Sequence, residues 1–211
     1  MRLLIAAALL LPLLVFATAS WIAYGHAFEE ARSRLQRTLD LVHEHAVKVF
    51  ETDDLVAEQV NESLAGLSDA DVRAREQALH ERFAKLSDRL AQVRGVWVLD
   101  RAGRPLFSSV LFPLPGTLDF SDRAYFRAHR DGTVPRGRDH VSEMLVSRPL
   151  GKRIFQVTTA REFGTEADGF AGVVVVTAEP SYFRDYYAQV AKDSGIGTTA
   201  LMREDGAILA R

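Results

Sequence analysis

The sequence predicts an α+β fold in which an N-terminal transmembrane helix and a long helical stalk precede a five-stranded antiparallel sheet with flanking helices. Three patterns predict it: a charge-free apolar run over residues 3–25, apolar residues at heptad spacing over 35–67, and five strand-like segments within 95–179. The 211 residues are 47% hydrophobic with a formal net charge of −2. This composition excludes a disordered chain and provides no positive field for binding nucleic acid.

Residues 1–25 are predicted to be a transmembrane signal anchor. The charge-free run over 3–25 would, at about 1.5 Å per helical residue, span the hydrocarbon core of a bilayer. Trp21 and Tyr24 lie at its far end, where aromatic rings favour the membrane–water interface. Because Arg2 and the N-terminal amine favour the cytoplasm, we expect the rest of the chain on the other side of the membrane.

A cleavable signal peptide is the alternative for this segment. Ala17-Thr18-Ala19 has the small-x-small shape of a cleavage site. Apolar character nevertheless continues as far as Tyr24, which a signal peptidase substrate does not need, so the uncleaved anchor is preferred. In both cases the body of the chain is expected to be extracytoplasmic.

Residues 26–94 are predicted to form two stalk helices. The first carries an a/d seam of apolar or small residues in alternating steps of four and three, with Asp53 and Ser63 filling two gaps in the run of Leu35, Leu39, Val42, Ala46, Val49, Val56, Val60 and Leu67. Gly66 ends this helix, and Ser68 caps a second helix whose own apolar stripe reaches Val93. The seam is equally suited to packing on the protein's own sheet and to forming a dimer interface that carries a signal to the membrane.

Residues 95–192 are predicted to form the sheet module. The expected elements are a hairpin of 95–100 with 105–109, a short helix over 119–130, strands over 141–148, 153–162 and 170–179, and a helix from Pro180 to about residue 191. The β-branched run Val173–Val176 places the last strand at the centre of the sheet.

Residues 193–211 are predicted to be a linker and the first hairpin of a second, truncated sheet module. Superposing Gly206 on Gly103 places Leu201 on Val98 and Leu209 on Leu106, which indicates an internal repeat. Because an isolated hairpin is marginally stable in water, we expect it to open a second module that the sequence does not complete.

Several classes of catalytic and metal site are excluded by the residues. The chain has no cysteine and lacks the nucleophile elbow, the zinc-protease motif and the P-loop. Residues 195–200 match G-x-G-x-x-A, but a predicted helix precedes them and a strand follows, the reverse of a dinucleotide site. His43 and His45, two residues apart on a helix, point to different faces and cannot chelate a metal together. We expect no catalytic residue, no cofactor and no metal.

The order of elements, together with three motifs, resembles the double Cache (PDC, PAS-like) sensor region of bacterial membrane receptors. The motifs are GVWVLD at 95–100, DRAYF at 122–126 and GFAGVV at 169–174. The chain looks most similar to the branch found on diguanylate cyclases and sensor histidine kinases, with the first PAS-like module entire and the second barely begun. It departs from the amino-acid-binding subgroup, because Arg123 is followed by Ala124-Tyr125-Phe126 and not by a Trp-Tyr pair.

The resemblance implies that the membrane-distal module binds a small ligand between its sheet and the overlying helix and loops. A small organic anion requires guanidinium, hydroxyl or imidazole donors that converge in an apolar pocket. The candidate ligand-binding residues are Arg123, Tyr125, Arg127 and His129 on one short segment, and Ser142, Arg148, Gln156 and Thr158 on the strands of the pocket floor. The alternative is that Tyr125 is a core aromatic and the arginines are solvated.

The sequence therefore predicts the extracytoplasmic small-molecule sensing region of a bacterial transmembrane signalling receptor, a sensor histidine kinase or a diguanylate cyclase. We expect it in the inner membrane with its body in the periplasm or outside the cell, dimeric through the stalk, binding a small-molecule ligand and no nucleic acid. The alternative function is a membrane-anchored periplasmic binding module without signalling output.

Overall fold

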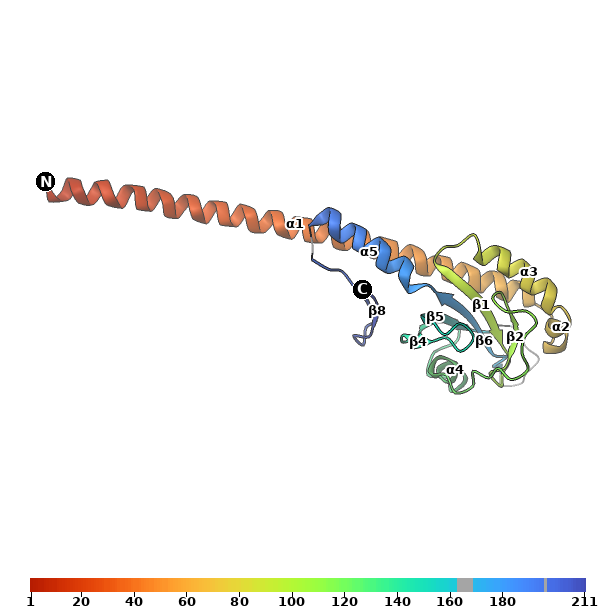
Figure 1. Cartoon of the computed structure of the whole chain (residues 1–211). Helices are drawn as coiled ribbons and strands as arrows, with labels where there is room; N and C mark the ends of the chain where they lie inside the picture. Colours follow the sequence, from red (N-terminus) through yellow and green to blue (C-terminus); the bar gives the residue numbers. More distant parts are fainter. Residues whose placement is uncertain (163–168, 196) are drawn as a thin grey trace.

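The computed structural model describes residues 1–162, 169–195 and 197–211; for 2–9 it describes the helix but not the side chains. A single long helix, α1 (Arg2–Leu64), runs from the N-terminus, and its C-terminal part lies against a sheet (Figure 1). A second helix, α5 (Pro180–Ser194), lies alongside α1 on the side of the sheet that faces the N-terminus (Figure 1). The predicted combination of a long apolar helix and an antiparallel sheet is confirmed.

Helix α1 is continuous from the apolar N-terminal segment into the stalk. Its 63 residues include Pro12, near the helix start. In the described part of the chain, α1 is the one helix that is long and apolar enough to cross a membrane, and its apolar window is not buried in the protein. Because a signal sequence passes the same test, both sequence interpretations of residues 1–25 remain compatible with this helix.

The second stalk helix is shorter than predicted and divided at Arg75 into α2 (Asp69–Ala74) and α3 (Glu76–Ser87). The predicted cap is confirmed, because the Ser68 hydroxyl accepts from the Asp71 N–H while the Asp71 carboxylate accepts from the Ser68 N–H. Val72, Leu79 and Phe83 of the predicted stripe are buried against the sheet. The two short helices cover the same face of the sheet as α1 (Figure 1).

The sheet is antiparallel, with strand order β2-β1-β6-β5-β3 and β4 also paired with β5. Its strands are β1 (Val93–Leu99), β2 (Pro105–Ser108), β3 (His140–Val141), β4 (Leu145–Val146), β5 (Arg153–Ala160) and β6 (Val173–Ala178). Strand β6 lies between β1 and β5, so the central position predicted from Val173–Val176 is confirmed.

Two elements differ from the prediction. The strand expected over 141–148 is interrupted, so that β3 and β4 pair separately with the two ends of β5. The helix expected over 119–130 is α4 (Ala124–Arg130), because the Asp119 carboxylate accepts from the Ser121 N–H at 2.7 Å and thereby forms a turn where a first helical turn was expected.

The two faces of the sheet are covered by different layers. Alternate residues Val96, Val98, Val174 and Val176 face α1 and α3 in one apolar cluster. The opposite face carries Trp97, Leu99, Val173 and Val175, packed with residues of α4 and of the loop before it. Because both faces are buried, the central strands read as continuous apolar runs.

The stalk seam packs mainly on the protein itself. Val49, Val56 and Val60 are buried between α1 and the sheet or α5, whereas Leu35 and Leu39 are 55% and 63% exposed. Packing on the protein's own sheet and helices is therefore the correct interpretation for the seam from Val49 to Val60. A dimer interface centred on Val49, which the continuous seam allowed, is wrong because this side chain is 3% exposed within one chain.

The C-terminal hairpin repeats the backbone geometry of the first hairpin. Strand β7 (Leu201–Met202) pairs with β8 (Ile208–Ala210), and the turn glycine Gly206 has φ +88°, compared with +83° at Gly103. The Gly206 N–H donates to the Arg203 carbonyl as the Gly103 N–H donates to Asp100. The predicted repeat is confirmed at this hairpin, and the second module remains a prediction.

Candidate ligand pocket

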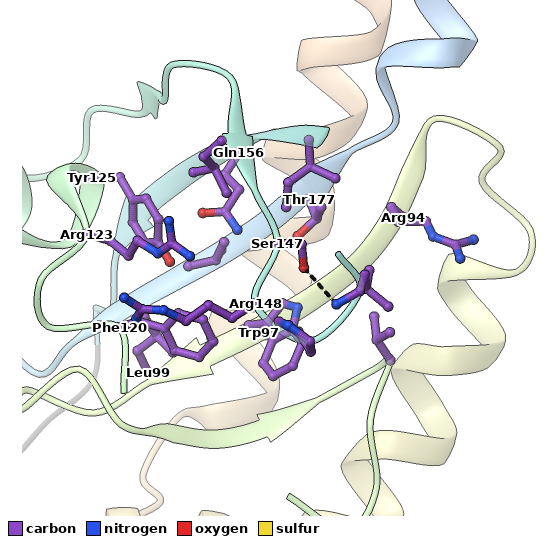
Figure 2. A pocket seen from close by; sticks show the side chains of 16 residues that line it. Arg94, Trp97, Leu99, Phe120, Arg123, Tyr125, Ser147, Arg148, Gln156 and Thr177 are labelled. Atoms are coloured by element: carbon purple, nitrogen blue, oxygen red, sulfur yellow. Dashed lines mark hydrogen bonds between the residues drawn. The ribbon is translucent and has the colours of Figure 1, made fainter. Parts of the chain in front are cut away.

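A pocket lies on the sheet face that is turned away from α1, below α4 and the 147–150 turn (Figure 2). We call it the sheet pocket. It is lined by Arg94, Trp97, Leu99, Val110, Phe120, Arg123, Tyr125, Leu145, Ser147, Arg148, Pro149, Leu150, Ile154, Gln156, Val175 and Thr177.

Strand register brings the floor of the sheet pocket together. Trp97 on β1 faces Val175 on β6, and Thr177 on β6 faces Gln156 on β5. Because side chains alternate along a strand, these residues project to the same face as Leu99. The sequence thus places an aromatic wall beside two polar groups on neighbouring strands.

The first hairpin positions Phe120 over this floor. The Phe120 N–H donates to the Gly103 carbonyl at 2.9 Å. A Cβ atom on Gly103 would lie 2.6 Å from the Ser121 backbone nitrogen, and its φ of +83° also favours glycine. Phe120 then packs edge-on against Trp97, with ring centroids 5.7 Å apart.

Helix α4 contributes Arg123 and Tyr125 to the pocket wall. Arg123 is the N-cap residue, and its Nη2 donates to the Val146 carbonyl at 3.2 Å. Tyr125 is 2% exposed and lines the pocket beside Gln156. Burial raises the pKa of Tyr125, so its hydroxyl is a neutral donor at physiological pH.

Arg148 closes the mouth of the pocket through exposed contacts. Its guanidinium donates to both oxygens of the Asp122 carboxylate and to the Asp119 carbonyl, and it lies 5.9 Å from the centroid of the Phe120 ring. The hydrogen bond from Arg148 lowers the pKa of Asp122. Because the two side chains are 39% and 62% exposed, such a pair stabilises the fold by only about 0–1 kcal/mol. Arg148 can therefore exchange Asp122 for another anion at little cost.

The turn that carries Arg148 is shaped by its own hydrogen bonds. The Ser147 hydroxyl accepts from the Leu150 N–H at 3.3 Å, the dashed contact in Figure 2. The Gly151 N–H also donates to the Ser147 carbonyl at 2.8 Å. This compact turn holds Pro149 and Leu150 against the pocket.

Two buried polar atoms in the pocket have no hydrogen-bond partner. They are Gln156 Oε1 and Thr177 Oγ1, on side chains that belong to residues only 6% and 2% exposed. An unsatisfied buried group of this kind costs about 1–3 kcal/mol. Two such atoms on facing residues are therefore candidates for contact with a polar ligand.

The pocket is narrow. Its cavity volume is about 10 Å³. That is room for about one water. A metabolite of several non-hydrogen atoms can enter only if residues that line the pocket move apart.

The charge of the lining is positive. Three guanidinium groups, those of Arg94, Arg123 and Arg148, line the pocket, and no carboxylate is among the described lining residues. The neighbouring Glu179 lies 3.9 Å from Arg94, and Asp122 binds Arg148 at the mouth. Such a site favours an anion, which guanidinium forks bind through charge-assisted hydrogen bonds.

Four of the eight predicted ligand-binding residues line the sheet pocket: Arg123, Tyr125, Arg148 and Gln156. Arg127 does not, because it lies on the exposed side of α4. The prediction that Arg127 joins the others in one pocket is therefore corrected by the helix orientation.

His129, Ser142 and Thr158 also lie outside the sheet pocket, because their polar groups bind other parts of the protein. His129 Nε2 lies 3.1 Å from the Thr158 carbonyl, which can only accept, so this nitrogen carries the proton. Burial lowers the pKa of His129 to about 4, which leaves the ring neutral. Thr158 Oγ1 donates to the His140 carbonyl, and Ser142 Oγ accepts from the Gln156 N–H. These three residues hold α4 and the edge strand on the sheet.

The sequence interpretation missed Arg94, Trp97, Phe120, Ser147 and Thr177 as pocket residues. Hydropathy alternation could not reveal them, because the central strands are apolar on both faces. One signal was present: Thr177 is the first hydroxyl after four valines in the β6 sequence, on the same face as Val175. Among the described residues, no cluster of histidine, aspartate or glutamate could hold a metal ion.

Comparison with known proteins finds similarity among solved structures. No family model and no curated protein matches the chain. The extracellular domain of the putative histidine kinase rpHK1S-Z16 is 31% identical, with a TM-score of 0.57 over 71% of this chain. The chain spans 59% of that solved domain.

More distant structures share the fold. The Vibrio cholerae histidine kinase DctB sensor domain is 19% identical, with a TM-score of 0.51 over 71% of this chain and 56% of that one. The ligand-binding domain of the Pseudomonas aeruginosa chemoreceptor PctC, solved with GABA, is 19% identical, with a TM-score of 0.55 over 81% of this chain and 70% of that one. The chain therefore has the fold of extracellular sensor domains, in agreement with the resemblance to the Cache type.

Proposed function

We propose that this chain is the ligand-binding input region of a bacterial transmembrane receptor and that it binds a small organic anion in the sheet pocket. The observation that carries the proposal is that Arg123 and Arg148 lie in one apolar pocket with buried, unpartnered polar atoms (Figure 2). A pocket with a few convergent polar groups is the usual form of a small-molecule site. The fold shared with sensor domains of histidine kinases and chemoreceptors supports the same role.

The position of α1 supports the membrane part of the proposal. Residues 1–25 would anchor the chain in the inner membrane, with the sheet in the periplasm and the stalk helix joining the two. On the N-terminal side of Val42, the seam residues Leu35 and Leu39 are largely exposed, and we propose that they pair with a second copy of the chain. The output would be a histidine kinase or a diguanylate cyclase.

A membrane-anchored binding module without signalling output is the second candidate function. It shares the pocket and the anchor, and differs only in lacking coupling between them. The distance between α1 and α5 with and without ligand distinguishes the two.

The proposal predicts that ligand binding depends on Arg123. In thermal-shift titrations of the detergent-solubilised chain with C2–C6 mono- and dicarboxylates, at least one acid is expected to raise the melting temperature. Arg123→Ala should abolish this shift, because the charge-assisted hydrogen bonds to the carboxylate are lost. The melting temperature without acid should change little, since the one described side-chain hydrogen bond of Arg123 is to the Val146 carbonyl.

Arg127→Ala provides the matched control. Arg127 lies on the same helix but outside the pocket, so this variant should keep the wild-type ligand shift. An equal loss in both variants would indicate a general electrostatic effect and contradict the assignment. No shift of the wild-type chain with any acid would contradict an organic-anion ligand.

A further inference from the structure

The polar pair on the pocket floor carries information about the ligand beyond its negative charge. We propose that the ligand is a short hydroxycarboxylate whose carboxylate binds Arg123 and whose hydroxyl lies between Gln156 and Thr177. This inference rests on the proposed function and adds the chemical class of the ligand.

Gln156 and Thr177 are adjacent buried residues that both have an unpaired polar atom. They are register partners on β5 and β6, and both line the pocket (Figure 2). Gln156 Oε1 and Thr177 Oγ1 are each buried without a partner. The two side chains therefore offer an acceptor and a hydroxyl on the same face of neighbouring strands.

A ligand hydroxyl fits this pair because it both donates and accepts. It can donate to Gln156 Oε1, which only accepts, while it accepts from the Thr177 hydroxyl. An aliphatic C–H at the same position would leave both protein groups unsatisfied. Sites built from buried polar groups discriminate strongly against analogues that lack the matching group.

A ligand ammonium fits the pair less well. It could donate to both oxygens, but a buried cation also requires a counter-charge. The described lining residues include no carboxylate, and the two nearby ones are directed at Arg94 and Arg148. The lining is therefore suited to a neutral donor beside the carboxylate and not to an amino acid.

Arg123 is the carboxylate partner that the contacts favour. Arg94 lies beside Glu179, and Arg148 makes a two-oxygen contact with Asp122. The described hydrogen bond of Arg123 goes to a backbone carbonyl, which leaves most of its donors for an anion. Arg148 would then cover the ligand as its turn closes.

Two matched sets of acids test this inference on the full chain in detergent. One set is lactate, alanine and propionate; the other is 4-hydroxybutyrate, 4-aminobutyrate and butyrate. Within each set the carbon skeleton is constant and the substituent is hydroxyl, ammonium or hydrogen. Calorimetric titration is expected to show, in at least one set, that the hydroxy acid binds at least tenfold more tightly than both analogues.

Thr177→Val separates hydroxyl recognition from folding. The variant removes a buried hydroxyl that has no partner, so the melting temperature without ligand should be unchanged or higher. The preference for the hydroxy acid over the unsubstituted acid should fall at least fivefold. Thr159→Val, on the same sheet but outside the pocket, should keep the full preference.

The outcomes distinguish this inference from the function on which it rests. If propionate or butyrate binds as tightly as its hydroxy analogue, or an amino acid binds more tightly, the hydroxycarboxylate is wrong and the anion-binding function stands. If none of the six acids binds but another carboxylate of the thermal-shift panel does, the hydroxycarboxylate is again wrong. If no acid of either experiment binds, both proposals are overturned.

Discussion

Asp53 places a carboxyl group in an apolar environment. It lies in α1 facing the apolar core, it is fully buried, and neither carboxylate oxygen has a hydrogen-bond partner. Burial, and to a lesser extent the charge of Asp54, raises the pKa of Asp53 to about 8. Asp53 is therefore protonated in the folded chain at neutral pH, whereas in the unfolded chain it ionises near its ordinary pKa of 3.8.

This difference predicts that the chain loses stability as pH rises. Between the unfolded and folded pKa values the folded state binds the extra proton, so the free energy of unfolding falls by up to about 1.4 kcal/mol per pH unit. The stabilisation is complete below about pH 4 and lost by about pH 8. Asp53→Asn should flatten this slope, measured by denaturant unfolding from pH 5 to 8.

Asp54→Asn is the comparison variant. Desolvation and the charge of Asp139 raise the pKa of Asp54 to about 7, so its contribution has the same sign over a narrower window. Because Asp54 is exposed, we expect its replacement to change the slope less. An unfolding free energy of the wild-type chain that is constant from pH 5 to 8 would contradict a protonated Asp53.

At the residue scale the sequence predicted four polar residues of the pocket, Arg123, Tyr125, Arg148 and Gln156. Arg123 and Tyr125 lie in DRAYF, and both line the pocket. Thr177 and Trp97 lie in strands that are apolar on both faces, so only strand register, which no local pattern encodes, assigns them to the pocket face. Asp53 occupied an apolar position of the seam, and its burial depends on the tertiary packing of α1.

At the element scale, α1 changes role along its length. From Val42 towards the C-terminal end of α1, the apolar stripe is covered by the sheet and α5. Phe28, Leu35 and Leu39, at the same heptad spacing, are exposed. An exposed a/d stripe on a continuous helix is typical of a coiled-coil interface. The lower stalk is therefore where two copies are expected to meet.

Leu39→Asp should weaken this dimer without unfolding the chain. The substitution places a charge in the expected interface, but Leu39 is 63% exposed and contributes little to the monomer core. Analytical ultracentrifugation in detergent is expected to show at least a tenfold weaker association. Leu41→Asp, at a 51% exposed position two residues away on another face, should associate as the wild type.

The opposite result would relocate the interface. If Leu39→Asp and Leu41→Asp leave the monomer–dimer balance equally unchanged, the lower seam is not an interface. Val49→Asp is not a valid test, since Val49 packs with Phe155 and Phe183 and its replacement would unfold the module.

Element boundaries were predicted where a local signal exists. The first stalk helix ends at Leu64, close to the predicted stop at Gly66, and Ser68 caps the next helix as expected. The start of α4 was predicted too early, because an aspartate side chain can accept from a backbone N–H in a turn as well as at a helix start. Asp119 accepts from the Ser121 N–H in a turn. The interruption between β3 and β4 could not be predicted, because it depends on how the edge meets β5 and not on the residues between them.

At the scale of the whole molecule, one chain segment links the pocket to the stalk. Strand β6 carries Thr177 in the pocket floor and leads directly into α5, which begins at Pro180. Tyr186 of α5 stacks on His45 of α1, with ring centroids 3.8 Å apart. Thr177 is therefore three residues before the start of a helix that packs along the stalk (Figure 1), so a displacement of Thr177 can be transmitted to α5.

This arrangement predicts that ligand binding displaces α5 relative to α1. A ligand can shift the helices only if it binds two arrangements with different affinity, and the narrow pocket requires movement before a metabolite fits. Since the chain has no cysteine, cysteines introduced at the exposed Glu51 and Ala188 can be spin-labelled without background. Pulsed electron spin resonance with saturating acid should show a shift of about 1–2 Å between the labels.

The same labels on the Arg123→Ala background make the measurement specific to the pocket, because that variant should show no shift at the same acid concentration. A ligand-dependent shift in the parent chain alone would couple the pocket to the membrane helix and favour a receptor. An identical distance with and without bound acid would mean that binding does not move α5 relative to α1. The binding module without signalling output would then be the better description of this chain.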